Sequence, residues 1–395
     1  MEEKKSLDDR ISKMSEEVFF CKRCVNSNQR FGLTFDEKGV CDACQFADLK
    51  DNEIDWGKRE DELRVLLDKY RSKDGKYDVI VPGSGGKDSA YVAHKLKYKY
   101  GMNPLCLTWA PAMYTDIGWQ NLQSFIRSGF DVNLMFPDPK LHSKLAMLGL
   151  ELMGDPFLPW HYGVRSFPLR IAIQFDIPLV FYGENGRAEY GSGKDLWYKS
   201  GENLDYWKNY YSNLYKSVDV YIEEGIRRGL IKESDISSSL ELYKLPSFEN
   251  LEQLQIDMKW FSYYKKWIPQ ENYYYATENC GFKPNSKRTE GTYSKYASLD
   301  DKMDGIHYYM QFIKIGIGRC TSEASQEIRS KLINREEGVA LVHKYDGECP
   351  HEYFRECLEY MDITEERFWE IVDRFRPPHL WKEEDGNWKL KYRVS

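Results

Sequence analysis

The sequence predicts an α/β protein whose centre is a doubly wound parallel β-sheet. Short apolar segments alternate with helix-like segments between residues 77 and 182, in the order strand, helix, strand. Glycine-rich turns follow the first and the last of these apolar segments. Alternation of this kind is typical of parallel sheets, because consecutive parallel strands need a long, usually helical, connection. At 395 residues the chain is long enough for two or three domains.

Each predicted element rests on its own pattern of apolar residues. Runs of apolar and β-branched residues predict strands at residues 77–82, 104–109, 132–136 and 177–182. Apolar residues at helical spacing predict helices at residues 56–70, 90–100, 117–128, 167–175, 322–335 and 364–376. Pro377 and Pro378 stop the last of these helices.

A glycine-rich loop separates the first predicted strand from the helix that follows it, and it consists of Gly83, Ser84, Gly85, Gly86, Lys87, Asp88 and Ser89. At such a turn, backbone N–H groups and the positive end of a helix dipole surround one point, which suits a phosphate. Ser84 and Ser89 add hydroxyl donors, and Lys87 adds a positive charge. The loop is therefore predicted to bind a phosphate.

Asp88 is the unexpected residue of this loop. Because bound polyphosphate would repel a carboxylate unless a cation lay between them, we interpret Asp88 as a ligand of Mg²⁺. The alternative is an N-capping Asp or Ser at an ordinary strand-to-helix turn, but capping needs one such residue and not the whole loop. A Walker A loop is a poorer match, because it ends in Gly-Lys-Ser/Thr and here Asp88 follows Lys87.

Three turns of the predicted sheet should meet at one site. In doubly wound sheets, ligands bind beyond the carboxyl ends of the strands. Residues 84–89, 108–111 and 183–189 follow the first, second and fourth predicted strands. We therefore expect Thr108 and the turn that contains Glu184 to lie beside the glycine-rich loop, with Thr108 among the residues that bind ATP and its pyrophosphate.

Four cysteines near the start of the chain have the spacing of a metal site. Cys21 and Cys24 form one Cys-x₂-Cys pair, and Cys41 and Cys44 form a second pair after sixteen intervening residues. Two such pairs can hold one tetrahedral Zn²⁺, and a closed site of four thiolates has a structural role. Residues 31–40 have alternating apolar residues and include turn formers, as a zinc ribbon would. A redox dithiol and an iron–sulfur cluster are the alternatives that the spacing also permits.

The second half of the chain has a different character. Residues 191–295 are rich in Trp and Tyr and have few strand signals, which predicts a helical insertion. We interpret its aromatic residues mainly as core, with a stacking surface for a sugar or base as the alternative. Further on, Lys314 and Arg319 flank two glycines, Gly316 and Gly318, which predicts either a second anion-binding turn or a tight turn with solvated charges.

Composition limits the function classes. Lysine and arginine number 56 against 63 acidic residues, and the net charge of −7 argues against a strong nucleic-acid binder. No apolar run approaches the roughly 20 residues that cross a bilayer, and the start of the chain does not have the pattern of a signal peptide. Nine cysteines with one clustered set suit a reducing compartment, so we expect a cytoplasmic protein.

Taken together, these motifs resemble those of the bacterial N-acetyl sugar amidotransferases. The loop after Pro82 resembles the PP-loop of the ATP pyrophosphatase superfamily, and the family likeness adds the cysteine pairs, residues 183–191 and residues 312–321. The resemblance implies an ATP-dependent enzyme of lipopolysaccharide O-antigen, surface-polysaccharide or flagellin-sugar biosynthesis. It would convert an acetamido group into an acetamidino group, through an O-adenylyl imidate attacked by ammonia, with release of AMP and pyrophosphate.

The resemblance also implies roles for individual residues. Residues 83–89 would hold the ATP pyrophosphate, with Mg²⁺ at Asp88 and Lys87 as a catalytic charge. Glu184 and Asn185 would bind Mg²⁺, the adenylate or the reacting amide. Glu189 would accept a proton from ammonia, with a surface carboxylate as the alternative. The residues expected to contact the phosphates or an anionic part of the substrate are Lys314, Arg319 and Thr321.

The expected domain order follows from the same reading. It comprises a zinc ribbon at 1–50, a linking helix at 51–76, a PP-loop ATP-binding domain at 77–190, the helical insertion at 191–295, and at 296–395 a segment that completes the active site.

The remaining cysteines show no glutaminase motif, since Cys106, Cys280, Cys320, Cys349 and Cys357 lack a nucleophile-elbow context. The resemblance therefore implies a separate glutaminase subunit and a cyclase-like ammonia conduit, both similar to enzymes of histidine biosynthesis.

Two other functions stay open at this point. A PP-loop tRNA thiolase also combines such a loop with cysteine pairs, but it would need a basic RNA surface, which the net charge disfavours. A non-enzymatic zinc-ribbon interaction module is disfavoured by the intact loop with both serines and Asp88.

Overall fold

The computed structural model describes residue 8 and residues 10–207 and 216–395, and its centre is a six-stranded sheet. The strands follow the order β3-β2-β1-β4-β6-β5, and every neighbouring pair is parallel except β5 with β6. They are β1 (Val79–Pro82), β2 (Pro104–Trp109), β3 (Asp131–Met135), β4 (Leu179–Tyr182), β5 (Gly201–Glu202) and β6 (Asp257–Trp260). The predicted α/β class with a mostly parallel sheet is confirmed.

The strand order places a topological switch point between β1 and β4. The chain runs from β1 outward to β2 and β3, and then returns to the other side of β1 to form β4. Ile80 is the residue of β1 that registers with both neighbours, with Leu105 of β2 and with Val180 of β4. Because the connections leave in opposite directions here, a crevice opens beyond the carboxyl ends of β1 and β4.

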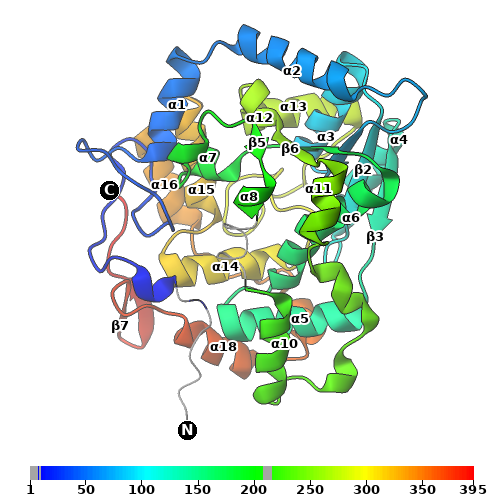
Figure 1. Ribbon diagram of the computed structural model, residues 1–395. Coiled ribbons are helices and arrows are strands. Elements are labelled where there is room, and N and C mark those ends of the chain that lie inside the picture. The colour runs from blue at the N-terminus through cyan, green and yellow to red at the C-terminus, as the bar shows by residue number, and fades with distance from the viewer. Residues whose placement is uncertain (1–7, 9, 208–215) are drawn as a thin grey trace.

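Helices cover both faces of the sheet, because successive strand residues point to opposite sides. Ile80 and Leu105 join the core formed with α5 (Pro139–Met153) and α6 (Leu158–Phe175). Val81 and Cys106 join the core of the other face. That face is covered by α2 (Trp56–Tyr70), α3 (Lys87–His94), α4 (Asp116–Arg127) and α13 (Pro269–Cys280), and Figure 1 shows α2 and α13 on one side of the molecule and α5 on the opposite side.

Local sequence signals account for the ends of these helices. Thr115 caps α4 by accepting a hydrogen bond from the N–H of Gly118, and Asp138 caps α5 by accepting one from the N–H of Lys140. Gly154 ends α5 in the left-handed conformation. The predicted helix at 90–100 is α3 followed by a π-helical turn, η2 (Lys95–Lys99).

The predicted helical insertion at 191–295 is wrong in one respect, because it contributes two strands to the central sheet. β6 pairs in parallel with β4 and registers Met258 with Val180, and β5 pairs with β6. Met258 and Trp260 are buried while Asp257 and Lys259 are partly exposed, so β6 does alternate, but over only four residues. A signal this short cannot be separated from the surrounding helical pattern.

The rest of the insertion is helical, as predicted. After the short helix α7 (Gly186–Tyr190), which precedes it, its described α-helices are α8 (Leu204–Tyr206), α10 (Val218–Arg227), α11 (Phe248–Leu254), α12 (Phe261–Tyr264) and α13. Its described aromatic residues lie mainly within the hydrophobic clusters or against them; the buried ones include Trp207, Tyr221, Tyr243, Phe261 and Trp267, whereas Tyr198 and Tyr274 are exposed. Tyr210 and Tyr211, which belong to the same predicted aromatic group, lie outside the described residues.

The segment after the insertion is helical and packs beside the N-terminal cysteines. It contains α14 (Asp304–Ile315), α15 (Arg319–Arg329), α16 (Arg335–Tyr345), α17 (Phe354–Met361), α18 (Glu365–Arg374) and the hairpin of β7 (Trp381–Glu384) with β8 (Asn387–Leu390). Ala324 and Ile328 of α15 share a hydrophobic cluster with Cys24 and Cys44. The N-terminal cysteines and α15 thus share one core, and helix α1 (Asp42–Asn52) lies next to α15 and α16 in Figure 1.

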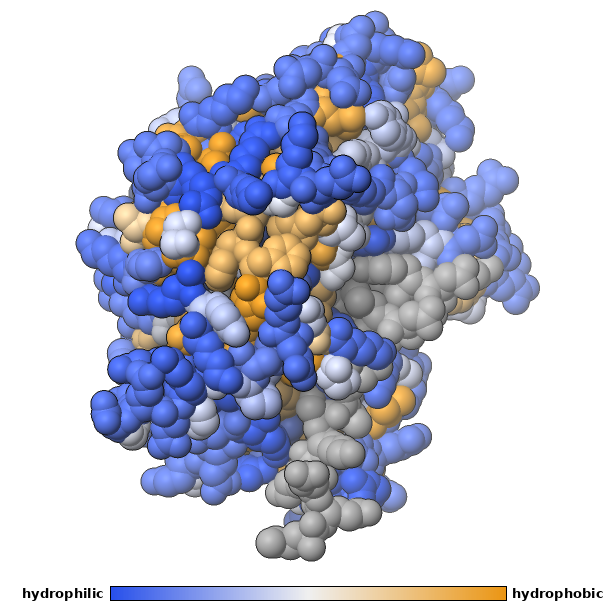
Figure 2. Space-filling model, turned by 90° about the vertical axis from the view of Figure 1, so that its left-hand side faces the viewer, coloured by the Kyte–Doolittle hydropathy of each residue, from blue (hydrophilic) through white to orange (hydrophobic). Residues whose placement is uncertain are grey.

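The cysteine segment has the four-cysteine cluster that fits the predicted zinc ribbon, although its strand pairing is reduced to isolated bridges. In its described part, isolated bridges join Phe20 to Ser27 and Phe35 to Cys41 without extending into strands. Helix α1 (Asp42–Asn52) begins directly after Cys41 and carries Cys44 in its first turn. Figure 2 shows this side of the molecule, where a small group of apolar residues is surrounded by hydrophilic ones.

Within the described ranges, no helix combines the length and the apolar character needed to cross a bilayer.

Candidate active site

The glycine-rich loop joins β1 to α3, and its shape depends on two glycines. Gly85 has φ +81°, and a Cβ on it would lie 2.8 Å from the Cα of Leu122 in α4. A Cβ on Gly83 would lie 2.1 Å from the Cβ of Ser89. The loop therefore requires glycine at both positions: Gly85 for its positive φ and its close packing, and Gly83 for its close packing alone.

Backbone and hydroxyl hydrogen bonds hold the loop at the end of the sheet. The N–H of Gly83 donates to the carbonyl of Leu107 at 2.8 Å, and the hydroxyl of Thr108 donates to the carbonyl of Gly83 at 2.7 Å. Ser89 donates to the carbonyl of Gly86 at 3.1 Å. Thr108 is buried and supports the loop from β2, and it is not among the described residues that line the cavity in front of the loop.

The carboxylate of Asp88 does not cap the helix that it belongs to. Helix α3 begins after Gly86, which has no side chain. The Asp88 carboxylate instead contacts the ammonium of Lys87 and accepts a hydrogen bond of 2.9 Å from the side-chain amide of Asn272 in α13. These contacts hold the Asp88 side chain toward the crevice, where a Mg²⁺ ligand would have to lie.

The turn after β4 brings a second carboxylate to the same crevice. Asn185 caps α7 by accepting a hydrogen bond of 3.3 Å from the N–H of Ala188, and its own N–H donates to the hydroxyl of Ser262 at 3.0 Å. This anchoring fixes the preceding residue, Glu184. Burial, and then the negative charge of Asp88, raise the pKa of Glu184 to about 7. Two carboxylates that oppose each other's ionisation are an arrangement that a divalent cation stabilises.

Two cavities meet at this pair of carboxylates. The larger, of about 740 Å³, lies in front of the loop, where Gly83, Ser84, Gly86 and Ser89 line it, and aromatic side chains such as Trp109 form part of its wall. The second, of about 310 Å³, is lined by Lys87 and by residues of α14 and α15. The residues common to both walls are Arg30, Asp88, Glu184, Tyr190 and Gln311. A group bound at Asp88 and Glu184 can therefore reach ligands in either cavity.

Glu189 lies away from these two cavities, although it follows Glu184 closely in sequence. Its carboxylate pairs with the ammonium of Lys50 at 2.6 Å, and the residue is only 3 % exposed. It borders a separate cavity of about 60 Å³, between α1 and α15. The structure thus brings Glu189 neither to the crevice nor to the surface, and it ties the cysteine segment to the turn after β4.

The turn with two glycines after α14 holds a carboxylate of the chain itself. The N–H of Gly318 donates to Asp346 at 2.9 Å, and the hydroxyl of Thr321 donates to the same carboxylate at 2.6 Å. The predicted second anion-binding turn is therefore occupied internally, which removes Thr321 from the cavities. Lys314 is buried elsewhere and donates to the carbonyl of Met153 at 3.0 Å. Of the three predicted anion contacts, Arg319 alone reaches a cavity wall, that of the second cavity.

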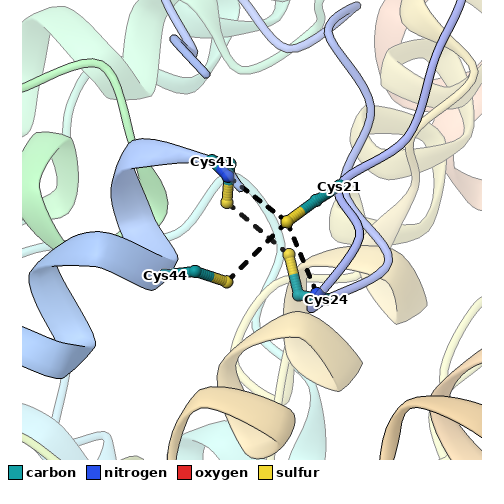
Figure 3. Close-up of side chains that lie close together, drawn as sticks. All are labelled: Cys21, Cys24, Cys41 and Cys44. Carbon is teal, nitrogen blue, oxygen red and sulfur yellow. Dashed lines mark hydrogen bonds between the residues drawn. The ribbon is translucent and has the colours of Figure 1, made fainter. Parts of the chain in front are cut away.

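The four N-terminal cysteines are brought together as the spacing predicted. All four are fully buried, with Sγ–Sγ distances of 4.0 Å between Cys21 and Cys44 and 3.7 Å between Cys24 and Cys41 (Figure 3). Thiolates at zinc–sulfur distances of about 2.3 Å in a tetrahedron lie about 3.8 Å apart, so the set fits Zn²⁺. The N–H of Cys41 also donates to Cys21 Sγ at 3.3 Å, which stabilises a thiolate there.

Comparison with known proteins bears on the C-terminal segment. Residues 290–394 match the family model described as LPS biosynthesis protein WbpG-like, C-terminal domain. The match supports the N-acetyl sugar amidotransferase family. This WbpG-like segment carries α14 and α15, and it therefore supplies the side of the second cavity that faces Lys87 and Glu184. The WbpG-like segment therefore forms part of the crevice wall and is not a separate domain.

The chain is also similar to an uncharacterized protein, MJ1599, of Methanocaldococcus jannaschii. The two are 30% identical over 88 residues, which are 22% of this chain and 31% of that protein. The chain thus matches about a third of the length of this curated relative.

Two residues of the crevice carry no signal in the sequence. Asn272 contacts Asp88 from a helix of the insertion, and Arg30 reaches both cavities from the cysteine segment. The guanidinium of Arg30 lies 5.4 Å from the ring of Tyr190, a residue of the 183–191 segment that lines both cavities as well. An isolated Asn or Arg fits no motif, so only the positions of Asn272 and Arg30 in the fold indicate a function.

Proposed function

We propose that the protein is an ATP-dependent amidotransferase that converts an acetamido group of a bacterial sugar into an acetamidino group. The observation that carries the proposal is the shared position of Asp88 and Glu184. These carboxylates join the cavity of the glycine-rich loop to a cavity walled by the WbpG-like segment. A lipopolysaccharide-type sugar and a nucleotide could therefore meet at one point.

ATP binds in the larger cavity in this proposal. Its β- and γ-phosphates lie against the amides of residues 83–86 and the N-terminus of α3, where Lys87 adds a positive charge. Asp88 holds Mg²⁺, which supplies charge neutralisation on the phosphates, and one carboxylate beside substrate phosphates is a common Mg²⁺ environment. The aromatic wall that includes Trp109 suits the adenine ring.

The sugar binds in the second cavity, which is polar and faces the phosphates. Arg319, Glu323 and Gln326 line it and can form hydrogen bonds with hydroxyl and carboxyl groups of a sugar. The oxygen of the acetamido group attacks the α-phosphorus of ATP, pyrophosphate leaves, and the amide nitrogen releases its proton to solvent, which gives an O-adenylyl imidate. This step turns a poor leaving group into a good one, AMP.

Ammonia then attacks the imidate carbon, and AMP leaves with the former amide oxygen. The attacking nitrogen must lose a proton, and the carboxylate of Glu184 can accept it as a general base. Glu184 takes the place that the sequence suggested for Glu189, because Glu184 borders both cavities.

Ammonia comes from a separate glutaminase in this proposal, through a cyclase-like conduit. A glutaminase cysteine must form a thiolate. Burial raises the pKa of Cys349 to about 11 and that of Cys280 to about 12, and it raises the pKa of Cys106, Cys320 and Cys357 as well. None of these thiols suits nucleophilic attack, which supports an external source of ammonia.

The test separates the two chemical steps. The protein is incubated with Mg-ATP, an ammonium salt and nucleotide-linked or nonulosonic diacetamido sugars, and mass spectrometry follows AMP and a sugar in which NH replaces O. Pyrophosphate exchange into ATP, which needs the sugar alone, reports the first step. Asp88→Ala should lose exchange and product, whereas Glu184→Gln should keep exchange and lose the amidine.

Asp74→Ala changes an exposed carboxylate in the turn before β1 and serves as the control that should leave both steps intact. AMP release that depends on tRNA and not on the sugar would overturn the proposal in favour of a thiolase. Absence of AMP with every sugar, even with a glutaminase partner present, would favour a binding module.

A further inference from the structure

Three potential metal ligands lie together outside the pair of carboxylates and the cysteine cluster. Asp155 lies in the short connection between α5 and α6, His161 is in the first turns of α6, and His307 is in the first turn of α14. Asp155 Oδ1 is 2.8 Å from His307 Nδ1, and Asp155 Oδ2 is 3.4 Å from His161 Nε2. One ligand atom from each residue lies within 4.8 Å of the other two.

These three residues lie close enough together to share one metal ion. With metal–ligand bonds of about 2.0–2.1 Å, the donor atoms of a tetrahedron lie about 3.4 Å apart. The distance of 3.4 Å from Asp155 to His161 matches this value, whereas the 2.8 Å from Asp155 to His307 is that of a hydrogen bond, which must lengthen when an ion binds between the two groups. The cysteine cluster of the same chain shows the corresponding agreement for sulfur ligands.

The surroundings hold the two imidazoles in place. The ring of Phe157 packs edge-on against His307 at 4.8 Å and against His161 at 6.3 Å. Ring orientation is thus restricted by packing, as a preorganised ligand set requires. His161 lines the larger cavity and His307 lines the second, so the cluster lies in the partition between them.

The nearby ammonium of Lys314 has its own partners. It donates to the carbonyl of Met153 at 3.0 Å and lies 3.7 Å from the carboxylate of Asp8, a buried residue. Asp155 is therefore not required as its hydrogen-bonding partner. Its carboxylate can contribute a negative charge to a cation that it holds together with the two imidazoles.

We propose that Asp155, His161 and His307 bind one divalent transition-metal ion of the class that prefers imidazole, such as Zn²⁺, Co²⁺ or Fe²⁺. Imidazole ligands disfavour Mg²⁺ and Ca²⁺, so this ion differs from the Mg²⁺ assigned to Asp88. Three protein ligands leave an open coordination position, unlike the closed set of four cysteines. An oxygen or nitrogen atom of a molecule in either cavity can occupy that position. The proposal does not depend on the ATP chemistry.

Metal content of the full-length chain provides the test. The protein is equilibrated with Co²⁺ or Zn²⁺, freed of loose metal by gel filtration and analysed by inductively coupled plasma mass spectrometry. The wild type should hold about two ions per chain, one at the cysteines and one at the new site. His307→Ala and His161→Ala should each lose about one, and thiolate-to-Co²⁺ absorption should stay unchanged because it reports the cysteines.

A second variant and a control separate metal binding from a simple hydrogen-bonded network. His307→Gln keeps a side chain that can donate to Asp155 but is a poor metal ligand, so it should also lose one ion while remaining folded. His351→Ala changes an exposed histidine outside the cluster and should retain both ions. A wild type that binds one ion per chain, with the thiolate absorption saturated, would overturn the proposal. So would a folded His307→Gln protein that still binds two.

Discussion

The side-chain amide of Asn272 donates a hydrogen bond of 2.9 Å to the carboxylate of Asp88, across 184 positions of sequence. This contact joins α13 of the insertion to the first turn of α3. It orients the one acidic residue of the glycine-rich loop toward the crevice while Lys87 contacts the other carboxylate oxygen. The insertion therefore contributes directly to the site that the loop begins.

Asn272→Ala should weaken the site without unfolding the protein. A hydrogen bond to a charged group contributes about 1.5–3 kcal/mol, so AMP formation at limiting Mg²⁺ should fall by roughly tenfold or more. The measurement is the Mg²⁺ dependence of sugar-stimulated AMP release. Asn279→Ala, an exposed position of the same helix, is the matched control and should behave as the wild type. Equal Mg²⁺ dependence in both variants would show that Asn272 does not position Asp88.

Glu184→Gln should change the pH dependence of stability. An unfolded Glu184 ionises near its ordinary pKa of 4.5, and the folded residue ionises near 7. Between these pH values the unfolded chain releases a proton that the folded chain keeps, so the contribution of Glu184 to stability falls as the pH rises through this window.

At pH 8 the Gln variant should therefore be more stable than the wild type by about 2 kcal/mol, less than the full shift would give because the side chain keeps some exposure. Below pH 4.5 or so the two should converge. Urea unfolding at both pH values measures this difference, with Glu223→Gln at an exposed position of α10 as the control. A difference that does not vary with pH would show that the carboxyl of Glu184 is not shifted.

Gly85→Ala should destabilise the fold as well as the loop. A left-handed backbone costs a non-glycine residue about 1–2 kcal/mol, and the contact of 2.8 Å with Leu122 adds to that cost. The matched control is Gly86→Ala, because Gly86 has φ −68° and its Cβ would meet only Ser84 Oγ at 3.5 Å. Denaturant unfolding should show a loss of more than about 2 kcal/mol for the first variant and less than about 1 kcal/mol for the second. Similar losses would contradict the proposed steric role of Gly85.

Glu189→Gln should reduce stability because it leaves the buried ammonium of Lys50 without its counterion. Breaking a buried ion pair typically costs about 3–5 kcal/mol. The double variant Lys50→Met with Glu189→Leu replaces the pair by apolar side chains and should recover most of that loss. Its rate of amidine formation per folded molecule should be close to that of the wild type. A stable double variant without activity would instead return Glu189 to a catalytic role.

The local spacing of apolar residues was sufficient to predict a helix or strand where the element is long enough for that spacing to repeat. The predicted limits of the helix at 56–70 and the strand at 104–109 agree with α2 and β2, because each carries enough apolar residues to define its period. β6 was missed, since four residues with two buried side chains do not define a strand alone. The alternation at 31–40 gives only an isolated bridge from Phe35 to Cys41, and the helix that begins at Asp42 places Cys44 in its first turn beside the other cysteines.

The features of the candidate site also fall into two groups, those that the sequence predicts and those that depend on the tertiary structure. Sequence by itself determined the glycine-rich loop, the position of Asp88 and the clustering of four cysteines, because those features depend on residues close together in the chain. Only the tertiary structure decided that Glu184 lies near Asp88 while Glu189 pairs with Lys50, and that Asp346 fills the second glycine turn. It also brought Asn272 to Asp88, and it brought Asp155 together with His161 and His307. Those relationships depend on which elements pack together, and packing is set by the burial of many distant side chains at once and not by any local spacing.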